Sequence, residues 1–391
     1  MEIGLALSGG GIRAAVFHLG VLRRLADEGL LESVSQLSTV SGGSLITAAV
    51  FAKSRMQWPS SADYQRRLYG ELRHLLTTTD LLSFKAIGWT GLFRFHHRLL
   101  VHRARVLAKL LAERWGIDAR IRDLPDRPEW WINTTCLETG KNWRFSKREM
   151  GDWQFGRHFD PPFLLAEAAA GSAAVPYAIG ALHLQLPADG WYRTDPATRR
   201  PVERRVPQST SIHVWDGGAY ENLGLESIYK PDQGLLGCDF LICSDASGPL
   251  SRTISFSISA LLEGRLVSPR LFDICSDQIR SLRARMFMSS VTSGRVQGAL
   301  LRMGNSVRDV DLKANRQRRA ESYDEFQADR DVALAFQYPT DLRAISESQF
   351  DSIARHGYEI ADAVLTTHSP DQFPRSLRWQ AAQCYEVPND L

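Results

Sequence analysis

Two glycine-rich corners near the start of the chain constrain its fold more than any other feature. A short apolar run at 3–7 is followed by a glycine turn at 9–11 and by an amphipathic pattern over about 12–28. The same order returns when the apolar run at 34–40 gives way to a second helical pattern over 42–53. Strand–turn–helix units in tandem are typical of a parallel sheet with crossover helices. The sequence therefore predicts an α/β fold with a mainly parallel sheet.

The remaining chain divides into further strands and helices. Residues 185–210 are rich in Pro, Arg, Asp and Thr, which indicates a surface loop. An Ala-rich helix is predicted at 164–171 and a closing amphipathic helix at 346–365. A hairpin turn is expected at 138–141. Four more strands are predicted, at 131–135, 143–145, 212–215 and 240–244.

We expect residues 1–391 to form a single domain with two less regular segments. Residues 55–120 look almost wholly helical and basic, and we interpret them as an insertion or cap beside the sheet. Residues 246–335 are expected to be helical and mobile, and to form a candidate lid. The second half of that segment, 304–335, is polar and charged and shows no apolar period.

Composition excludes several classes of protein. A net charge of +3 is too small to indicate nucleic-acid binding. The five cysteines show no CxxC spacing, which argues against a disulfide framework or a zinc site and favours a reducing compartment. No basic stretch precedes an apolar run at the N-terminus, so no secretory signal is expected. The Ala- and Gly-rich stretch 163–182 contains Glu167 and Pro176, and is interpreted as a buried helix and loop rather than a membrane span.

Ser41 is the candidate nucleophile, because it lies where the second strand gives way to a helix and Gly42 and Gly43 follow it. A serine at such a turn is exposed beside the backbone N–H groups of a helix terminus. The competing interpretation is that Ser41 only caps the helix. Four other hydroxyls lie nearby: Ser8, Ser38, Thr39 and Ser44.

Asp216 is the candidate base for this serine, since a serine hydroxyl needs a proton acceptor. The motif Asp-Gly-Gly at 216–218 follows a predicted strand and places a carboxylate on a tight turn at the same edge of the sheet. The competing interpretation is an ordinary turn aspartate. The glycine turn at 9–11 supplies backbone N–H groups that suit a developing oxyanion.

Taken together, these segments resemble the patatin-like phospholipase family, and especially its branch near the eukaryotic cytosolic phospholipases. One departure is Thr39, which stands where the usual G-x-S-x-G elbow has its first glycine. That variant is closer to the cytosolic phospholipases than to patatin itself. The similar segments are the oxyanion loop at 9–14, the nucleophile elbow at 40–44, the block at 172–176, the aspartate motif at 216–218 and the closing region at 339–342 and 357–358.

The resemblance implies a three-layer α/β/α sandwich of the acyl-hydrolase type that cleaves phospholipid or lysophospholipid esters. Ser41 would attack the ester while Asp216 takes its proton, as a dyad without histidine. It implies no cofactor, no metal and no nucleic-acid partner. The expected location is the cytoplasm, with peripheral contact at the inner membrane face. The remaining site residues it implies are the oxyanion and substrate-binding residues Gly9, Gly10, Gly11, Gly42 and Arg13, of which Arg13 would support the loop or face a phosphate.

A basic helical face within 98–109 offers a way to contact anionic lipid. Its basic residues recur at intervals of three and four: Arg98, His102, Arg105 and Lys109. Three aromatic residues just before it could enter a bilayer: Trp89, Phe93 and Phe95. The alternative is a solvated face above a core stripe, with the aromatic residues in the core.

Three other functions remain open from the sequence. The pattern Gly9-x-Gly11-x-x-Ala14 fits a dinucleotide-binding turn, but the second strand ends at a serine rather than at an acidic residue. An α/β-hydrolase triad could use His356 or His368 after Asp216. A lipid-binding effector domain on the same fold would be inactive until a partner or a small molecule binds.

Overall fold

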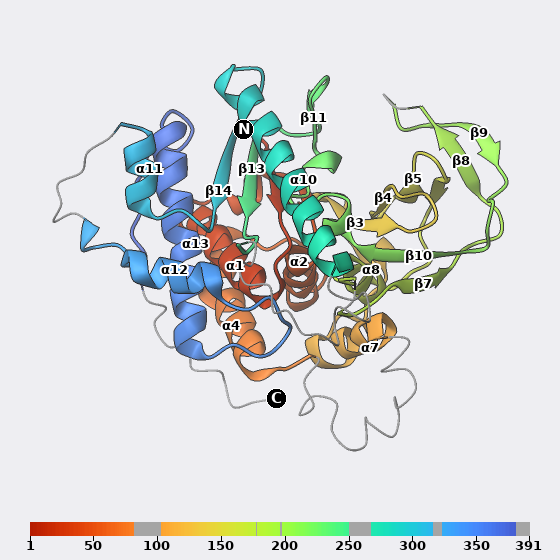
Figure 1. Ribbon diagram of the computed structural model, residues 1–391, viewed down its shortest axis with the longest axis horizontal. Helices are drawn as coiled ribbons and strands as arrows, with labels where there is room; N and C mark the ends of the chain where they lie inside the picture. The colour runs from red at the N-terminus through yellow and green to blue at the C-terminus, as the bar shows by residue number, and fades with distance from the viewer. Residues whose placement is uncertain (82–102, 177, 196–197, 250–266, 316–322, 381–391) are drawn as a thin grey trace.

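A mixed β-sheet runs through the centre of the molecule (Figure 1). The computed structural model describes residues 1–81, 103–176, 178–195, 198–249, 267–315 and 323–380. Five neighbouring strands are parallel: β14 (Gln297–Arg302), β13 (Phe240–Asp245), β1 (Ile3–Leu7), β2 (Val34–Thr39) and β3 (Glu129–Cys136). The parallel sheet predicted from the two glycine-rich corners is confirmed.

Beyond β3 the sheet continues with antiparallel strands. In order they are β4 (Asn142–Phe145), β5 (Glu149–Asp152), β6 (Gly156–Phe159), β8 (Trp191–Thr194) and β9 (Pro201–Arg205). β10 (Ser211–Asp216) pairs antiparallel with the end of β3 and with β7 (Leu182–Gln185). The prediction of a surface loop at 185–210 was wrong. β9 is solvent-exposed and polar along most of its length, so it shows no apolar alternation that would reveal a strand.

Helices cover both faces of the sheet. One layer contains α1 (Gly11–Asp27), α2 (Gly42–Lys53), α8 (Leu165–Ser172) and α13 (Glu347–His368), with α7 (Arg103–Trp115) beside α8. Three shorter helices also contact this layer: α4 (Tyr69–Thr78), α11 (Val307–Lys313) and α12 (Asp329–Gln337). α10 (Val267–Thr292) lies on the opposite face, where its Phe287 packs with Leu241 of β13 and Leu300 of β14.

Two hydrophobic cores follow from the alternation of side chains along the strands. In β1, Leu5 belongs to the large core under the α1 layer, whereas its neighbour Ala6 faces the smaller core under α10. β13 repeats this division with Ile242 and Cys243. Phe287 of α10 closes the smaller core. The strands are therefore buried on both sides, and the result is the three-layer α/β/α arrangement.

The two less regular segments contain more structure than the sequence indicated. Residues 246–335 include the strand β14 as well as α10, α11 and α12, and the latter two pack on α13. Within 55–120, α4 contacts α1 and α13, so this part belongs to the helical layer. The basic face expected at 98–109 lies partly outside the described residues, which resume at 103. The three aromatic residues expected before it lie wholly outside them. Within the described ranges, no helix combines the length and the apolar character needed to cross a membrane.

Candidate active site

Ser41 occupies a strained turn between β2 and α2. Its backbone angles are φ 51° and ψ −119°, a conformation that side-chain-bearing residues rarely adopt and that costs about 1–3 kcal/mol. Although Ser41 stands at the N-cap position, its hydroxyl makes no capping hydrogen bond. Its backbone N–H donates to the Ser172 hydroxyl at 3.0 Å. The geometry therefore favours a turn that presents the Ser41 hydroxyl over a turn that uses it as a cap.

Buried hydroxyls hold this turn in place. The hydroxyls of Thr39 and Ser44 lie 2.7 Å apart, and those of Ser44 and Ser172 lie 2.8 Å apart. Ser172 in turn donates to the carbonyl of Asn133 on β3 at 2.7 Å. These hydrogen bonds link the Ser41 turn to the end of α8 and to the neighbouring strand β3. Thr39, at the position where the usual elbow has glycine, therefore contributes a hydrogen bond.

The glycines after Ser41 are required by close backbone approach. A Cβ atom on Gly42 would lie 2.2 Å from the carbonyl oxygen of Gly11, and one on Gly43 would lie 2.5 Å from that of Leu7. The serine turn and the glycine turn are thus in direct backbone contact. Only glycine allows the two corners to approach this closely.

Asp216 ends β10 with its carboxylate buried beside Ser41. Its Oδ1 accepts the backbone N–H of Gly218 at 2.7 Å, and its own N–H donates to the carbonyl of Ala174 at 3.0 Å. Burial raises the pKa of Asp216 to about 6, while hydrogen bonds from the Ser41 hydroxyl and the Gly218 N–H oppose that rise. An acceptor with this pKa is largely ionised at neutral pH and is a stronger base than an ordinary aspartate.

The glycine turn between β1 and α1 adopts conformations that favour glycine. Gly10 has φ 144° and Gly11 has φ 64°. The N–H of Gly9 donates to the carbonyl of Asn222 at 3.2 Å. Within the described part of the chain, the N–H groups of Gly10 and Gly11 make no backbone hydrogen bond, and they stand at the positive end of α1. Backbone N–H groups without a backbone acceptor at the start of a helix favour the binding of an anion.

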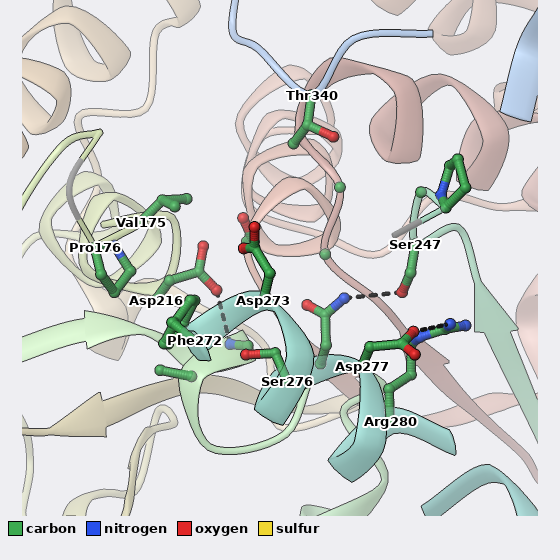
Figure 2. A pocket seen from close by; sticks show the side chains of 18 of the residues that line it. Val175, Pro176, Asp216, Ser247, Phe272, Asp273, Ser276, Asp277, Arg280 and Thr340 are labelled. Atoms are coloured by element: carbon green, nitrogen blue, oxygen red, sulfur yellow. Dashed lines mark hydrogen bonds and ion pairs between the residues drawn. The ribbon is translucent and has the colours of Figure 1, made fainter. Parts of the chain in front are cut away.

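These elements meet at a pocket with a volume of about 330 Å³ (Figure 2). Five residues singled out from the sequence line it: Gly9, Gly10, Arg13, Ser41 and Asp216. Gly11 and Gly42 do not line it, but pack against each other where the two corners meet. Val175 and Pro176 form an apolar part of the wall near Asp216.

Arg13 lines the pocket, yet its guanidinium is occupied by a neighbouring segment. It donates to the carbonyls of Phe336 and Tyr338, and to the Thr340 hydroxyl at 3.0 Å. Burial lowers the pKa of Arg13 to about 10, and Asp245 partly offsets that effect. The contacts place Arg13 as an anchor for residues 336–340. These bonds go to a segment other than the glycine loop, so support of that loop and contact with a phosphate both stay predictions for Arg13.

One face of α10 forms the wall that sequence reasoning missed. Arg280 on this face donates to Asp245 of β13 at 2.9 Å and to Asp277 at 2.5 Å. Residues 246–335 are expected from the sequence to be helical, but nothing in that pattern shows that α10 packs against β13. The pocket residues that α10 contributes are Phe272, Asp273, Ser276, Asp277 and Arg280. Two other missed residues are Asn222 and Ser247, whose side chains are joined by a hydrogen bond of 2.9 Å; Ser247 is labelled in Figure 2.

Histidine takes no part in this pocket as far as the described residues show. Nε2 of His356 hydrogen-bonds to the carbonyl of Met303 at 2.6 Å, and burial lowers the pKa of this imidazole to about 4. His368 is likewise absent from the described pocket lining. The triad alternative therefore lacks a histidine in position. Among the described residues, no group of three His, Cys, Asp or Glu side chains is placed to hold a metal ion.

Comparisons with known proteins agree with the fold and show the family. The model of the family described as patatin-like phospholipase matches residues 5–229. Among solved structures, human GIVD cytosolic phospholipase A2 is similar with a TM-score of 0.53 at 15% identity, covering 94% of this chain and 62% of that one. The same human protein in complex with methyl γ-linolenyl fluorophosphonate gives 0.52 at 16% identity, with 95% and 59% covered. This chain thus spans about three fifths of the length of those solved chains. A search of curated protein sequences found no match.

Proposed function

This chain belongs to the patatin-like phospholipase family, and from that membership we propose that it is a serine hydrolase of fatty-acyl esters. The single observation that carries the proposal is the Ser41 turn, which is strained, makes no capping bond and lies at the buried carboxylate of Asp216, whose pKa the Ser41 side chain lowers. Strain at a non-glycine residue is a feature of functional sites. A serine with a proton acceptor in the same pocket forms the minimal apparatus for acyl transfer.

In the first half-reaction, the Ser41 oxygen attacks the ester carbonyl and its proton passes to Asp216. The tetrahedral intermediate carries its negative charge on the former carbonyl oxygen. Collapse expels the alcohol, which takes a proton from Asp216, and leaves the fatty acyl group on Ser41. The raised pKa of Asp216 suits both roles, because a group near pH 6 can accept and return a proton at neutral pH.

The oxyanion is bound at the start of α1 by the backbone N–H of Gly10, which lines the pocket, and by that of Gly11, the next residue of the same turn. These groups are fixed before substrate arrives, because the turn is anchored through Gly9 and packed against Gly42. Preorganised donors of this kind stabilise the transition state without reorganisation, and removing one typically costs about 10²–10³ in rate.

In the second half-reaction, water attacks the acyl-serine while Asp216 takes its proton. The fatty acid leaves as the Ser41 oxygen is reprotonated by Asp216, which restores the starting state. No histidine is required, because the same carboxylate serves as base in both steps. We propose phospholipid or lysophospholipid as the substrate, on the strength of the family to which the chain belongs.

The test compares native protein with Ser41→Ala on mixed phospholipid and lysophospholipid vesicles, with products identified by mass spectrometry. We expect free fatty acid from native protein and at most about a thousandth of that rate from the variant. Ser348→Ala, at an exposed serine of α13, is the matched control and should behave as native.

A fluorophosphonate provides the second measurement, because it should label native protein at Ser41 alone and leave Ser41→Ala unlabelled. Native turnover by Ser41→Ala would contradict the proposal. Lipid binding by native protein with no fatty-acid release and no labelling would instead favour the effector interpretation.

A further inference from the structure

Asn222 lies between the glycine turn and the turn that carries Asp216, six residues after that aspartate. We propose that Asn222 is a positioning residue, which sets the glycine turn at a fixed distance from Asp216 and so aims the oxyanion donors at the carbonyl that Ser41 attacks. The inference rests on the proposed function. It concerns a residue that touches the site's supporting turns and acts through them.

The first contact is with the glycine turn. The carbonyl of Asn222 accepts the N–H of Gly9 at 3.2 Å. Its side-chain oxygen packs so closely on the same turn that a Cβ on Gly9 would lie 2.4 Å from it. Backbone and side chain of Asn222 therefore both fix Gly9, and the next N–H groups in the chain are those of Gly10 and Gly11.

The second contact is with the aspartate turn. A Cβ on Gly218 would lie 2.7 Å from the side-chain oxygen of Asn222 and 3.1 Å from Oδ1 of Asp216. Gly218 is also the residue whose N–H donates to that carboxylate at 2.7 Å. The amide of Asn222 thus fills the space between Gly9 on one turn and Gly218 on the other.

A third contact fixes which way the amide points. Its nitrogen donates to the Ser247 hydroxyl at 2.9 Å, the bond visible beside Ser247 in Figure 2. The N–H of Ser247 donates to Asp245 at 3.2 Å, and Asp245 is the partner of Arg280 on α10. This series of hydrogen bonds directs the amide oxygen of Asn222 toward Gly9 and Gly218. It also connects the Asn222 side chain to α10 on the opposite wall of the pocket.

These contacts explain why asparagine suits the position. Aspartate would have the same shape, but would lose the donor to Ser247 and bring a second negative charge close to Asp216. Alanine would leave the space between the two turns unfilled and would let Gly9 shift. A displacement of about 1 Å at a catalytic group can cost about 10²-fold in rate.

The experiment uses Asn222→Ala and Asn222→Asp in the full chain, with Asn305→Ala as a control at an asparagine outside the pocket. For both Asn222 variants we expect kcat to fall about 10–100-fold with KM changed by less than about threefold. Asn305→Ala should match native protein in both constants. Thermal unfolding of each variant separates loss of folded protein from loss of rate.

The decisive measurement is the ionisation of a trifluoromethyl ketone adduct, followed by ¹³C NMR of the labelled carbonyl carbon. The Ser41 oxygen adds to the ketone, its proton passes to Asp216, and the hemiketal oxygen takes the place of the oxyanion. In the Asn222 variants the pKa of the hemiketal hydroxyl should rise by about one unit, because misplaced N–H donors stabilise the hemiketal anion less. A purely structural role would reduce the amount of adduct but would leave this pKa unchanged.

The results separate the role of Asn222 from the proposed function. Native kinetics, or an unshifted hemiketal pKa in folded variants, would overturn the role of Asn222. If neither Asn222 variant folds, Ser247→Ala provides the test, since it removes only the acceptor of the amide, and an unshifted pKa there overturns the inference. Absence of adduct and of ester hydrolysis in native protein would refute the proposed function itself, which is a different failure.

Discussion

The parallel and antiparallel halves of the sheet differ in what they carry. The parallel strands β1 and β2 end in the glycine turn and in the Ser41 turn, and β10, which is antiparallel to the end of β3, adds Asp216 to the same pocket. The antiparallel strands β4 to β9 contribute no residue to the described pocket. They carry a cluster of aromatic rings, in which Trp143 lies 5.3 Å from Phe155 and 5.8 Å from Trp191 between ring centroids.

The difference follows from topology. Parallel strands bring their carboxyl ends, and the turns that follow them, to one edge of a sheet, which makes that edge a natural site. Antiparallel strands alternate in direction, so successive turns fall at opposite edges. The antiparallel half gains its stability from side-chain packing. Substitutions in one half should therefore change chemistry, and substitutions in the other should change stability.

The largest expected effect is the loss of the base. Asp216→Asn keeps the shape of the side chain and an acceptor for the Gly218 N–H, but it cannot take the proton of Ser41. We expect kcat/KM for ester hydrolysis to fall about 10³–10⁴-fold, equivalent to about 4–5.5 kcal/mol. The matched control is Asp189→Asn, at an exposed carboxylate before β8 in the other half. A kcat/KM of Asp216→Asn within tenfold of the native value would show that this edge of the sheet does not supply the base.

Next in size is an effect confined to stability. Trp143 is fully buried among the rings of the antiparallel half. Trp143→Ala should lower the free energy of unfolding by about 3–5 kcal/mol, through lost burial and the cavity left behind. Denaturation by urea measures that change, while kcat per folded molecule should stay at the native value. A large drop in kcat per folded molecule would show that the two halves are coupled.

Much of the parallel half of the sheet, and the two residues of the candidate dyad, could be predicted from the sequence. In the parallel half, α1, β2, α2 and β13 begin and end within one or two residues of the predicted bounds, because glycine turns and clear hydrophobic periods coincide there. Ser41 and Asp216 could be singled out because each stands at a strand end beside glycines. Local signals were enough wherever the function depends on the turn itself.

Elsewhere the decisive information is not local. β9 is a polar strand recognised through its pairing with β8, and β14 lies in a segment expected to be helical and mobile. The role of α10 in the pocket wall depends on its position over β13. Asn222 has no periodicity or motif of its own, and its contacts arise because two turns converge on it. Tertiary approach of this kind leaves no signal in a single sequence.

A smaller effect is expected from crowding the two corners. A Cβ on Gly42 would meet the Gly11 carbonyl at 2.2 Å, so Gly42→Ala must push the serine turn away from the glycine turn. We expect kcat/KM to fall about 10²-fold, or about 3 kcal/mol. Gly29→Ala is the control, since Gly29 has φ 73° but nothing within 4 Å of an added Cβ. It should lose about 1 kcal/mol of stability and no activity. Equal activity of both variants would mean that the corners tolerate separation.

The smallest expected effect is a pH-dependent change in the free energy of unfolding, caused by the ionisation of Asp216. Because burial raises the pKa of Asp216 to about 6, above the value near 3.9 of an unfolded chain, ionised Asp216 disfavours folding. Its favourable contribution is complete below about pH 4 and is lost as pH rises through 6. Asp216→Asn should therefore match native stability near pH 4 and exceed it by about 1–3 kcal/mol above pH 6–7.

Urea denaturation at several pH values between 4 and 8 measures this difference. Over the same range, native kcat/KM should fall about tenfold per unit below pH 6, as the base becomes protonated. Trp143→Ala should show the same activity profile as native protein, because its effect lies in the other half. A stability difference for Asp216→Asn that does not change between pH 4 and 8 would contradict a buried, ionised base. The gain in stability above pH 6 would be direct evidence that the site holds a charge that the fold alone does not favour.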